Sequence, residues 1–321
     1  MDKFLERYSS AIEQAFGEYY RRHTSPEHLS QPVHYILSLG GKRLRPALVL
    51  LAADSFGCPL EKAMPAAMAI EVFHNFSLVH DDIMDHAPLR RGHPTVHCRW
   101  DANTAILSGD VMMIQAYELF ESYQGDTFRE VILAFNRVAR QVCEGQQLDM
   151  DYEKIGDVSQ AQYMEMIRLK TAVLIGGALR IGGIVAGAST RELEALEGFG
   201  TDVGLAFQLT DDYLDTFGDP RTFGKRIGGD ILEEKKTFLY ITARERASQE
   251  EFERAFSLAD EEEKIEAVRD LYRATGADQA LREQIDRYTE KALAHVDRLP
   301  FSQPYREHYI RLARALVQRK L

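Results

Sequence analysis

The chain has few of the residues typical of β-rich, disulfide-linked or nucleic-acid-binding proteins. It has three cysteines, at positions 58, 98 and 143, without CxxC spacing, which favours reduced thiols in a cytoplasmic protein. Ten prolines in 321 residues and almost no alternating β-branched runs argue against a β-rich fold. Acidic residues outnumber basic ones 50 to 39, for a net charge of −11, and this disfavours nucleic acid as a partner.

Membrane-directed segments are also scarce. The first ten residues, MDKFLERYSS, are charged and lack the apolar run of a signal peptide. One stretch, residues 171–190, is almost uniformly apolar, but Arg180 lies at its centre. A charge there costs about 2.5–3.5 kcal/mol on membrane insertion, and the many Gly and Ala residues offset little of that cost. We therefore predict a closely packed core helix and no transmembrane segment.

The remaining pattern is one helix after another, without a linker or a short repeat. It predicts an all-α fold in a single domain over residues 1–321. Helices are expected at residues 2–22, 26–38, 45–56, 59–86, 104–123, 128–149, 159–188, 190–218, 232–247, 249–258, 261–275, 278–298 and 303–320.

Two aspartate motifs stand out on these helices. Residues 81–85 read DDIMD and residues 211–215 read DDYLD. On a helix, the first and last acids of DDxxD are i and i+4, so both carboxylates point the same way. Each motif ends an otherwise apolar helix, where the helix dipole is negative, and like charges one turn apart repel. The arrangement is therefore unfavourable unless cations neutralise it.

Solvated helix ends are the structural alternative, but apolar helices do not usually end in three acids twice. The functional interpretation is a site for a hard cation, and carboxylates at this spacing suit Mg²⁺. Mg²⁺ binds through one or two carboxylates together with substrate phosphates. The predicted metal-binding residues are Asp81, Asp82, Asp85, Asp211, Asp212 and Asp215.

Short basic groups accompany the acids, as a diphosphate site requires. Residues 40–46, GGKRLRP, form a glycine turn before a helix, and residues 90–91 are two arginines just after the first motif. Lys170-Thr171 opens the apolar stretch, and residues 225–230 (KRIGGD) and 235–237 (KKT) follow the second motif. Each group alone is more often a solvated surface patch, but two of them directly follow the acids. His74 lies on the same helix stripe as Asp81 and is either a core histidine or a substrate contact.

The motifs GGKRLRP, LVHDDIMD with LRRG, LKT, FQLTDDYLD and GKRIGGD with KKT occur in the order typical of trans-isoprenyl diphosphate synthases. The chain thus resembles the polyprenyl synthetase family, which includes farnesyl and geranylgeranyl diphosphate synthases, over about residues 34–240. The resemblance implies a single all-α bundle around a central cavity, a homodimer, and three Mg²⁺ ions per active site.

The resemblance also implies the reaction. An allylic diphosphate (dimethylallyl, geranyl or farnesyl) ionises with the help of Mg²⁺, and the double bond of isopentenyl diphosphate attacks the carbocation. A proton is then lost to the departing diphosphate. Asp81 and Asp211, with Lys170 and Thr171, resemble the catalytic residues of the family.

Substrate contacts follow from the same resemblance. The residues similar to isopentenyl diphosphate contacts are Lys42, Arg45, His74 and Arg91. The residues similar to allylic diphosphate contacts are Arg90, Lys170, Thr171, Gln208, Lys225 and Lys235.

Product length in the family depends on the residues four and five positions before the first aspartate. Here these are Ser77, which is small, and Phe76, which is bulky. The combination is similar to geranylgeranyl-type synthases (C20), with farnesyl (C15) as the close alternative. Arg226 follows Lys225 at a position that varies among members of the family. The motif does not indicate whether its charge reaches the diphosphate or the solvent.

Other readings of the sequence remain. A terpene cyclase shares the fold and one DDxxD, but its second metal motif differs and GGKRLRP would have no role there. Head-to-head synthases space their acids differently. A catalytically silent regulatory subunit of the same fold would have lost aspartates that this chain keeps. A structural protein that binds Ca²⁺ would leave the basic groups without a role.

Overall fold

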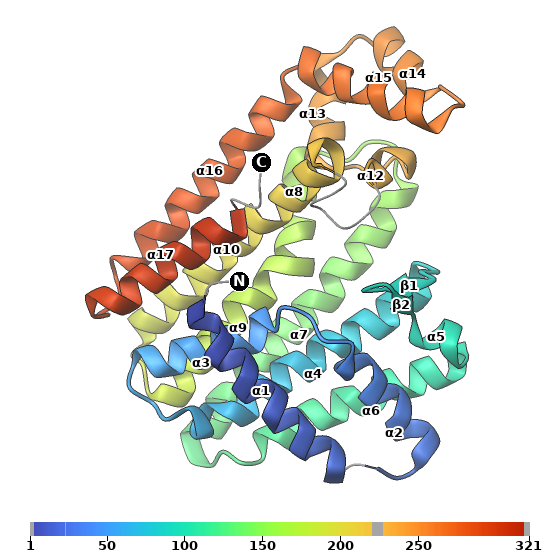
Figure 1. Cartoon of the computed structure of the whole chain (residues 1–321). Helices are drawn as coiled ribbons and strands as arrows, with labels where there is room; N and C mark the ends of the chain where they lie inside the picture. Colours follow the sequence, from blue (N-terminus) through green and yellow to red (C-terminus); the bar gives the residue numbers. More distant parts are fainter. Residues whose placement is uncertain (1–2, 23, 220–226, 318–321) are drawn as a thin grey trace. The chain divides into compact units, whose positions relative to one another are not determined.

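The computed structural model describes residues 3–22, 24–219 and 227–317, which form helices almost throughout (Figure 1). The predicted all-α class is confirmed. The chain divides into two compact units, residues 1–139 with 177–197 (unit 1) and residues 140–176 with 198–321 (unit 2). Three long helices contribute residues to both units: α7 (Gly125–Lys154), α9 (Val173–Ala186) and α10 (Thr190–Phe217). The predicted single domain over 1–321 stays a prediction.

Unit 1 is built around α4, which packs against α3 and α6. An aromatic cluster forms part of its core, with Phe73 edge-to-face against Phe135, and Phe120 beside Phe135. Buried residues occur around most of α4, as expected for a helix in the middle of a bundle. The helices that lie wholly within this unit are α1 (Lys3–Arg22), α2 (Glu27–Ser38), α3 (Leu44–Ser55), α4 (Leu60–Met84), α5 (Val96–Arg99) and α6 (Ala102–Phe120).

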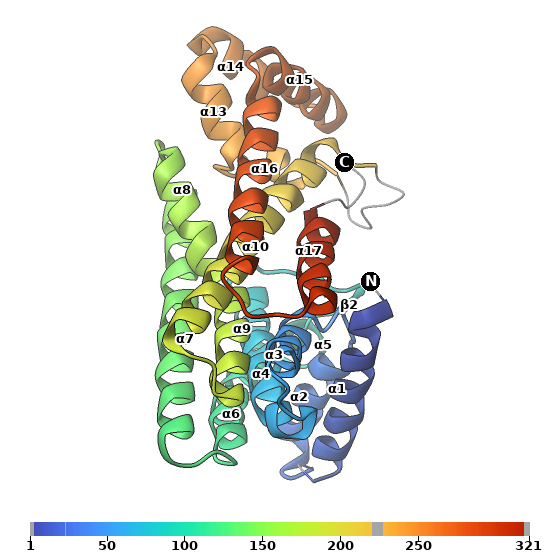
Figure 2. The same cartoon turned by 90° about the vertical axis from the view of Figure 1, so that its left-hand side faces the viewer.

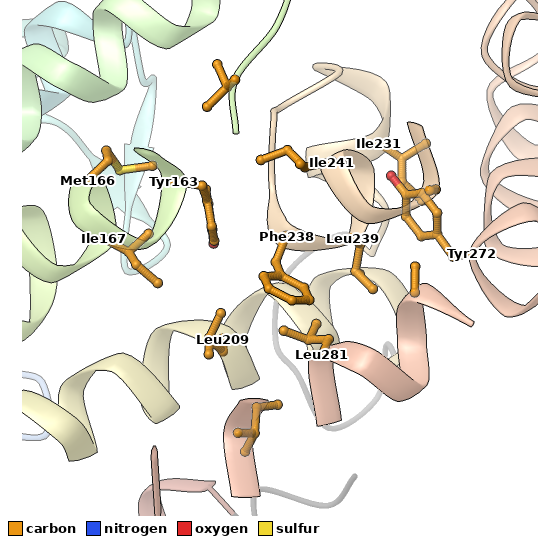
Figure 3. Packing of buried hydrophobic residues seen from close by; sticks show 14 of the residues in the cluster. Tyr163, Met166, Ile167, Leu209, Ile231, Phe238, Leu239, Ile241, Tyr272 and Leu281 are labelled. Carbon is orange, nitrogen blue, oxygen red and sulfur yellow. The ribbon is translucent and has the colours of Figure 1, made fainter. Parts of the chain in front are cut away.

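Unit 2 has its own hydrophobic cluster, to which several helices contribute (Figure 3). Tyr163, Leu209, Phe238 and Leu281 are each at most 3% exposed and come from α8, α10, α13 and α16. Helices α16 and α17 pack side by side (Figure 2). The elements are α8 (Gln160–Ile167), η1 (Arg168–Ala172), α12 (Gly229–Leu232), α13 (Phe238–Arg246), α14 (Gln249–Phe256), α15 (Glu261–Ala274), α16 (Ala277–Val296) and α17 (Gln303–Val317).

The structure corrects three local expectations. The predicted helix 159–188 is interrupted by a π-helical turn, η1, that contains Lys170 and Thr171. The predicted helix 232–247 is wrong at its start: α13 begins only after Thr237, whose side chain caps it by accepting from Tyr240 N–H. The break after residue 86 contains a small antiparallel hairpin, β1 (Leu89–Arg90) with β2 (His93–Pro94).

Residues 171–186 of the apolar stretch lie within the helical segment Gln160–Ala186, which includes the π-helical turn η1. It is the one helix in the described ranges long and apolar enough to cross a membrane, and 78% of its most apolar window is buried inside the protein. Glu197 pairs with Arg180 at 3.1 Å and with Arg137 at 2.5 Å. The central charge is thus neutralised by protein, which agrees with the predicted core helix.

Candidate active site

The first aspartate motif lies where α4 ends. Asp82 is 1% exposed and forms a bidentate ion pair with Arg90, whose Nε lies 2.8 and 2.9 Å from the two carboxylate oxygens. Burial raises the pKa of Asp82, and the Arg90 guanidinium opposes this rise. Asp81 is half-buried and Asp85, the C-cap of α4, is exposed. The structure therefore divides the motif: its middle acid holds Arg90, and its outer acids are accessible to a ligand.

Arg91 follows Arg90 in the turn of the β1–β2 hairpin, and its side chain contacts the glycine turn of the GGKRLRP segment. Arg91 Nη1 donates to the carbonyl oxygen of Gly40. Gly41 has φ +125°, and a Cβ there would lie 2.9 Å from Cζ of Arg91. Glycine is required at this position because a side chain would be strained and would displace the guanidinium.

Arg45 and His74 meet on neighbouring helices. Arg45 Nη1 of α3 lies 3.1 Å from Nε2 of His74 on α4. Burial, followed by the charge of Arg45, holds the pKa of His74 well below its usual value, so the imidazole is neutral and accepts this hydrogen bond. Burial lowers the pKa of Arg45 to about 10, so the guanidinium stays charged at neutral pH. Its buried Nε has no hydrogen-bond partner among the described residues, which leaves a donor for an anion.

These contacts bring together Arg45, His74, Arg91 and the exposed Lys42 on the glycine turn, the four residues that we expected to contact one diphosphate. All four belong to unit 1. His74 and Asp81 also share α4, about two turns apart, so the basic group and the first acidic motif have a common rigid support.

The second aspartate motif lies near the end of α10 and has a different environment. Asp212 is 5% exposed and accepts hydrogen bonds from Tyr163 Oη and from Gln208 Nε2, the latter at 3.1 Å. Burial, followed by the charge of Asp230, raises the pKa of Asp212 to about 8. Burial and the neighbouring acids therefore favour the protonated form of this middle acid at neutral pH. Asp211 and Asp215 are half-buried.

Asp230 belongs to the same acidic group, although sequence reasoning assigned it no role. Its N–H donates to Asp215 Oδ2 at 2.9 Å, and burial, followed by the charge of Asp215, raises its pKa to about 6. Lys235 lies 3.5 Å from Asp230 and 2.9 Å from Glu233, so this predicted substrate contact adjoins the acids. The signal was present in the sequence as the aspartate that ends KRIGGD. Lys225 and Arg226 lie outside the described residues.

Lys170 and Thr171 lie on the π-helical turn η1, a feature frequent at functional sites. The Lys170 ammonium pairs with Asp149 of α7. Thr171 Oγ1 donates to Gln208 Oε1 at 3.0 Å, and Gln208 in turn donates to Asp212. Hydrogen bonds thus connect the turn with the second aspartate motif.

Helix α7 supplies residues that the sequence did not reveal as functional. A Cβ on Gly145 would collide with the backbone N of Lys170, so only glycine permits this close approach of α7 to η1. Gln146 is 8% exposed, and neither of its amide atoms has a partner in the described part of the chain. The only sequence signal was the spacing of Gln146 and Asp149, which puts two polar groups on one face of α7.

The acids suit a cation that the protein binds only in part. Residues 3–22, 24–219 and 227–317 contain no group of three or more His, Cys, Asp or Glu side chains placed to bind a metal. Mg²⁺ typically binds through one or two carboxylates together with substrate oxygens, so a Mg²⁺ site here does not need three such side chains in one group. The raised pKa values of Asp212 and Asp230 come in part from neighbouring carboxylates, and a cation would relieve this repulsion.

The two predicted chain-length residues lie one turn or so before Asp81 on α4. The ring of Phe76 is half-buried, with its centroid 5.6 Å from that of Phe73 and 4.8 Å from that of His80. Ser77 donates from Oγ to the His74 carbonyl oxygen at 2.9 Å. Phe76 is therefore the outermost ring of the aromatic cluster that continues through Phe73 into the core of unit 1.

Comparison with known proteins identifies the family. Residues 26–275 match the polyprenyl synthetase family model. The chain is similar to the short chain isoprenyl diphosphate synthase of Methanothermobacter thermautotrophicus, with 40% identity over 277 residues, 85% of each chain.

Two solved structures share the fold. The chain is similar to a geranylgeranyl pyrophosphate synthase, with a TM-score of 0.92 and 46% identity, covering 98% of this chain and 99% of that one. It is also similar to the geranylgeranyl pyrophosphate synthase of Corynebacterium glutamicum complexed with isoprenyl diphosphate and magnesium (TM-score 0.87, 28% identity, covering 100% and 99%).

The chain therefore belongs to the polyprenyl synthetase family. Within it, the chain is an isoprenyl diphosphate synthase, a prenyltransferase of isoprenoid biosynthesis, as its motifs predicted.

Proposed function

We propose that the protein condenses isopentenyl diphosphate head-to-tail with an allylic diphosphate to give a short-chain all-trans product, C20, with C15 as the alternative. The observation that carries this proposal is the basic group of unit 1 on the same helix as the first aspartate motif. His74 and Arg45 are half-buried and joined by a hydrogen bond, and Asp81 lies about two turns farther along α4. Such a support sets the distance between an anion-binding group and a metal-binding acid.

The basic group binds the diphosphate of isopentenyl diphosphate in this proposal. Arg45 and Arg91 supply planar guanidinium donors, which suit phosphate oxygens, and Lys42 adds an exposed charge. Neutral His74 orients Arg45, and the free Nε of Arg45 supplies a donor. No acid of the DDxxD motifs is needed for this substrate, because its diphosphate does not leave.

The aspartate motifs hold Mg²⁺ for the allylic diphosphate. Asp81, Asp85, Asp211 and Asp215 are the accessible acids, and we propose three Mg²⁺ ions per active site. When bound, Mg²⁺ supplies positive charge that stabilises the leaving diphosphate. Asp82 holds Arg90 beside the first motif, and Asp212 holds Gln208 beside the second.

Other side chains orient the allylic substrate and its cation. Arg90, Lys170 and Lys235 offer charges for the allylic diphosphate, and Lys225, which lies outside the described residues, is assigned the same role. Thr171 Oγ1 and the Gln208 carbonyl are oxygen dipoles that stabilise the positive carbon. The proton lost at the end goes to the departing diphosphate, so the protein need not supply a general base, and the double bond of isopentenyl diphosphate is itself the nucleophile.

Product length is set by Phe76. Its ring adjoins the buried ring of Phe73, which packs edge-to-face against Phe135, whereas the neighbouring Ser77 is small. A tail that reaches Phe76 meets a packed aromatic core.

We propose that the active form is a cytoplasmic homodimer. Ile106, Leu107 and Ile114 of α6 are 46%, 58% and 57% exposed, and Leu133 of α7 is 59% exposed. Four large apolar side chains on adjoining helices of unit 1, linked by the Tyr117–Asn136 hydrogen bond at 2.5 Å, fit a second copy of the chain. Leu107→Glu is expected to give monomers in light-scattering measurements, whereas Arg129→Glu, on the same face of the unit but charged already, serves as the solubility control.

The function is tested by incubating purified protein with isopentenyl diphosphate and each allylic primer, with and without Mg²⁺. Products are dephosphorylated and sized by chromatography and mass spectrometry. A Mg²⁺-dependent C20 or C15 alcohol supports the proposal and identifies the primer and the length together. Folded protein that extends no primer would contradict it and would favour a silent regulatory subunit or a terpene cyclase.

A further inference from the structure

Arg43 lies between Lys42 and Arg45 in the glycine turn, yet its side chain points into the protein. It is 3% exposed, and its backbone has φ +45° and ψ +35°. Residues other than glycine rarely adopt this left-handed conformation. Such a conformation costs on the order of 1–2 kcal/mol and persists only where surrounding contacts enforce it. The residue therefore needs contacts that hold it.

Three groups from three helices provide these contacts. Arg43 Nε donates to Glu13 Oε1 of α1 at 2.6 Å, and Nη1 donates to Glu71 Oε1 of α4 at 2.8 Å. Nη2 donates to the carbonyl oxygen of Leu37 in α2. The guanidinium is thus satisfied on three sides.

Glu71 is itself held in place. It is 2% exposed, and its Oε1 also accepts from Asn75 Nδ2 at 3.2 Å, while the same amide nitrogen donates to the Glu71 carbonyl oxygen at 2.8 Å. A buried charge pair whose members have further hydrogen bonds is rigid, because loss of either member leaves an uncompensated charge.

This clamp (Glu13, Arg43 and Glu71) lies directly under the basic group. Lys42 precedes Arg43 in the chain, and Arg45 is the second residue of the helix for which Arg43 is the N-cap. Glu71 lies on α4 one turn before His74. The clamp therefore joins the turn that carries Lys42 to the two helices that carry Arg45 and His74.

We propose that Arg43 is a positioning residue for isopentenyl diphosphate: its clamp with Glu13 and Glu71 fixes the left-handed turn that places Lys42 and Arg45, and thereby couples helix α1 to affinity for this one substrate. The inference rests on the proposed function of the basic group. It adds Glu13, Arg43 and Glu71, which do not contact the substrate, and it gives helix α1 a role in the affinity for isopentenyl diphosphate.

Arg43→Gly tests the clamp, because glycine adopts the left-handed turn without strain but lacks the guanidinium. The expected result is a KM for isopentenyl diphosphate raised about tenfold or more, since small misplacements of binding groups are costly, with KM for the allylic substrate nearly unchanged. Glu13→Gln, at a half-exposed side chain, should raise the same KM by a smaller factor and keep the fold.

Asp54→Asn is the matched control. Asp54 of α3 pairs with Arg7 of α1 and accepts from Tyr8 Oη at 2.7 Å, so it also joins α1 to α3 but does not contact the turn. This variant should lower the melting temperature without changing either KM. Arg43→Lys, which keeps charge but not the three-sided geometry, should resemble Arg43→Gly more than wild type.

An unchanged KM for isopentenyl diphosphate in Arg43→Gly, or equal rises in both KM values, would overturn the inference while wild-type condensation upheld the proposed function. If wild-type protein condenses no substrates, the proposed function fails instead. Calorimetric titration with isopentenyl diphosphate then still tests the clamp, because Arg43→Gly must weaken binding relative to wild type and Asp54→Asn must not.

Discussion

The two DDxxD motifs have the same spacing but opposite electrostatic surroundings. In the first, the buried middle acid, Asp82, forms a bidentate ion pair with Arg90. In the second, the buried middle acid, Asp212, has hydrogen bonds from Tyr163 and Gln208 and lies near another acid, Asp230. One middle acid is paired with an arginine of the protein, whereas the other has a pKa raised to about 8, which favours its protonated form at neutral pH.

This difference shows that a motif repeated in sequence need not repeat its chemistry. Around the first motif, the protein itself supplies positive charge, from Arg90 and from the basic group nearby. Around the second, the described residues contribute excess negative charge, so an added cation has the larger effect there. We expect Mg²⁺ binding to raise the free energy of unfolding of unit 2 more than that of unit 1. A ligand that binds only the folded state stabilises it by mass action.

The largest expected effect comes from removing an outer acid of either motif. Asp81→Ala and Asp211→Ala should each lower kcat by at least about a thousandfold, since each removes a metal ligand needed to stabilise the leaving diphosphate. Steady-state assays at saturating Mg²⁺ measure this effect, and circular dichroism should show unchanged helix content. Near-normal turnover in either variant would break the proposed equivalence of the outer acids.

Substitution of the middle acids should distinguish the two motifs most clearly, by the loss of stability that each substitution causes. Asp82→Asn leaves the half-buried Arg90, 27% exposed, without its charged partner and should destabilise the protein by about 1.5–3 kcal/mol. Asp212→Asn replaces a carboxyl group that is already neutral and should cost less than about 1 kcal/mol. Urea unfolding at neutral pH without Mg²⁺ tests both, and equal losses would contradict the contrast between ion pair and proton.

His74 gives the basic group a pH dependence opposite in sign to that of the second motif, where the raised pKa values of Asp212 and Asp230 favour the folded state at lower pH. Because burial, followed by Arg45, lowers the folded-state pKa of His74, the unfolded chain binds a proton below about pH 6.5 that the folded chain does not. The unfolding free energy should therefore fall as the pH drops below this value, by at most about 1.4 kcal/mol per pH unit for this group.

His74→Gln should reduce that slope between pH 7 and pH 5, as measured by urea unfolding at several pH values. His28→Gln is the control, because His28 is exposed on α2 and its replacement should leave the slope unchanged. A slope that is the same in wild type and in His74→Gln would show that folding does not lower the pKa of this imidazole.

The smallest expected change concerns product length alone. Phe76→Ala should shift products toward one further isoprene unit, because removal of the outermost ring opens space as far as Phe73. Chromatography of the dephosphorylated alcohols measures the shift, with Phe128→Ala on α7, an exposed ring, as the control. An unchanged distribution would remove Phe76 from the mechanism of length control.

Much of the site was predictable because its chemistry requires rare residue combinations. The two aspartate motifs, GGKRLRP and Lys170-Thr171 were visible as dense polar groups on apolar helices. Asp149, Gln146, Tyr163 and Asp230 were not, because each is a single polar residue whose meaning depends on a distant partner. Helices were predicted well, and the starts of α13 and η1 were not, because a side-chain cap and a π-helical turn depend on local and tertiary contacts.

The sequence by itself determined the all-α class, the family and the acids available for a cation, since helical periodicity and i,i+4 spacing depend only on neighbouring residues. The tertiary structure decided the charge of each acid and the direction of each arginine. Arg43 and Arg45 are two residues apart, yet one is bound by two glutamates and the other lies against a neutral histidine. Burial and ion pairing decide such differences, and both arise from residues that are far apart in the chain and come together only in the folded protein.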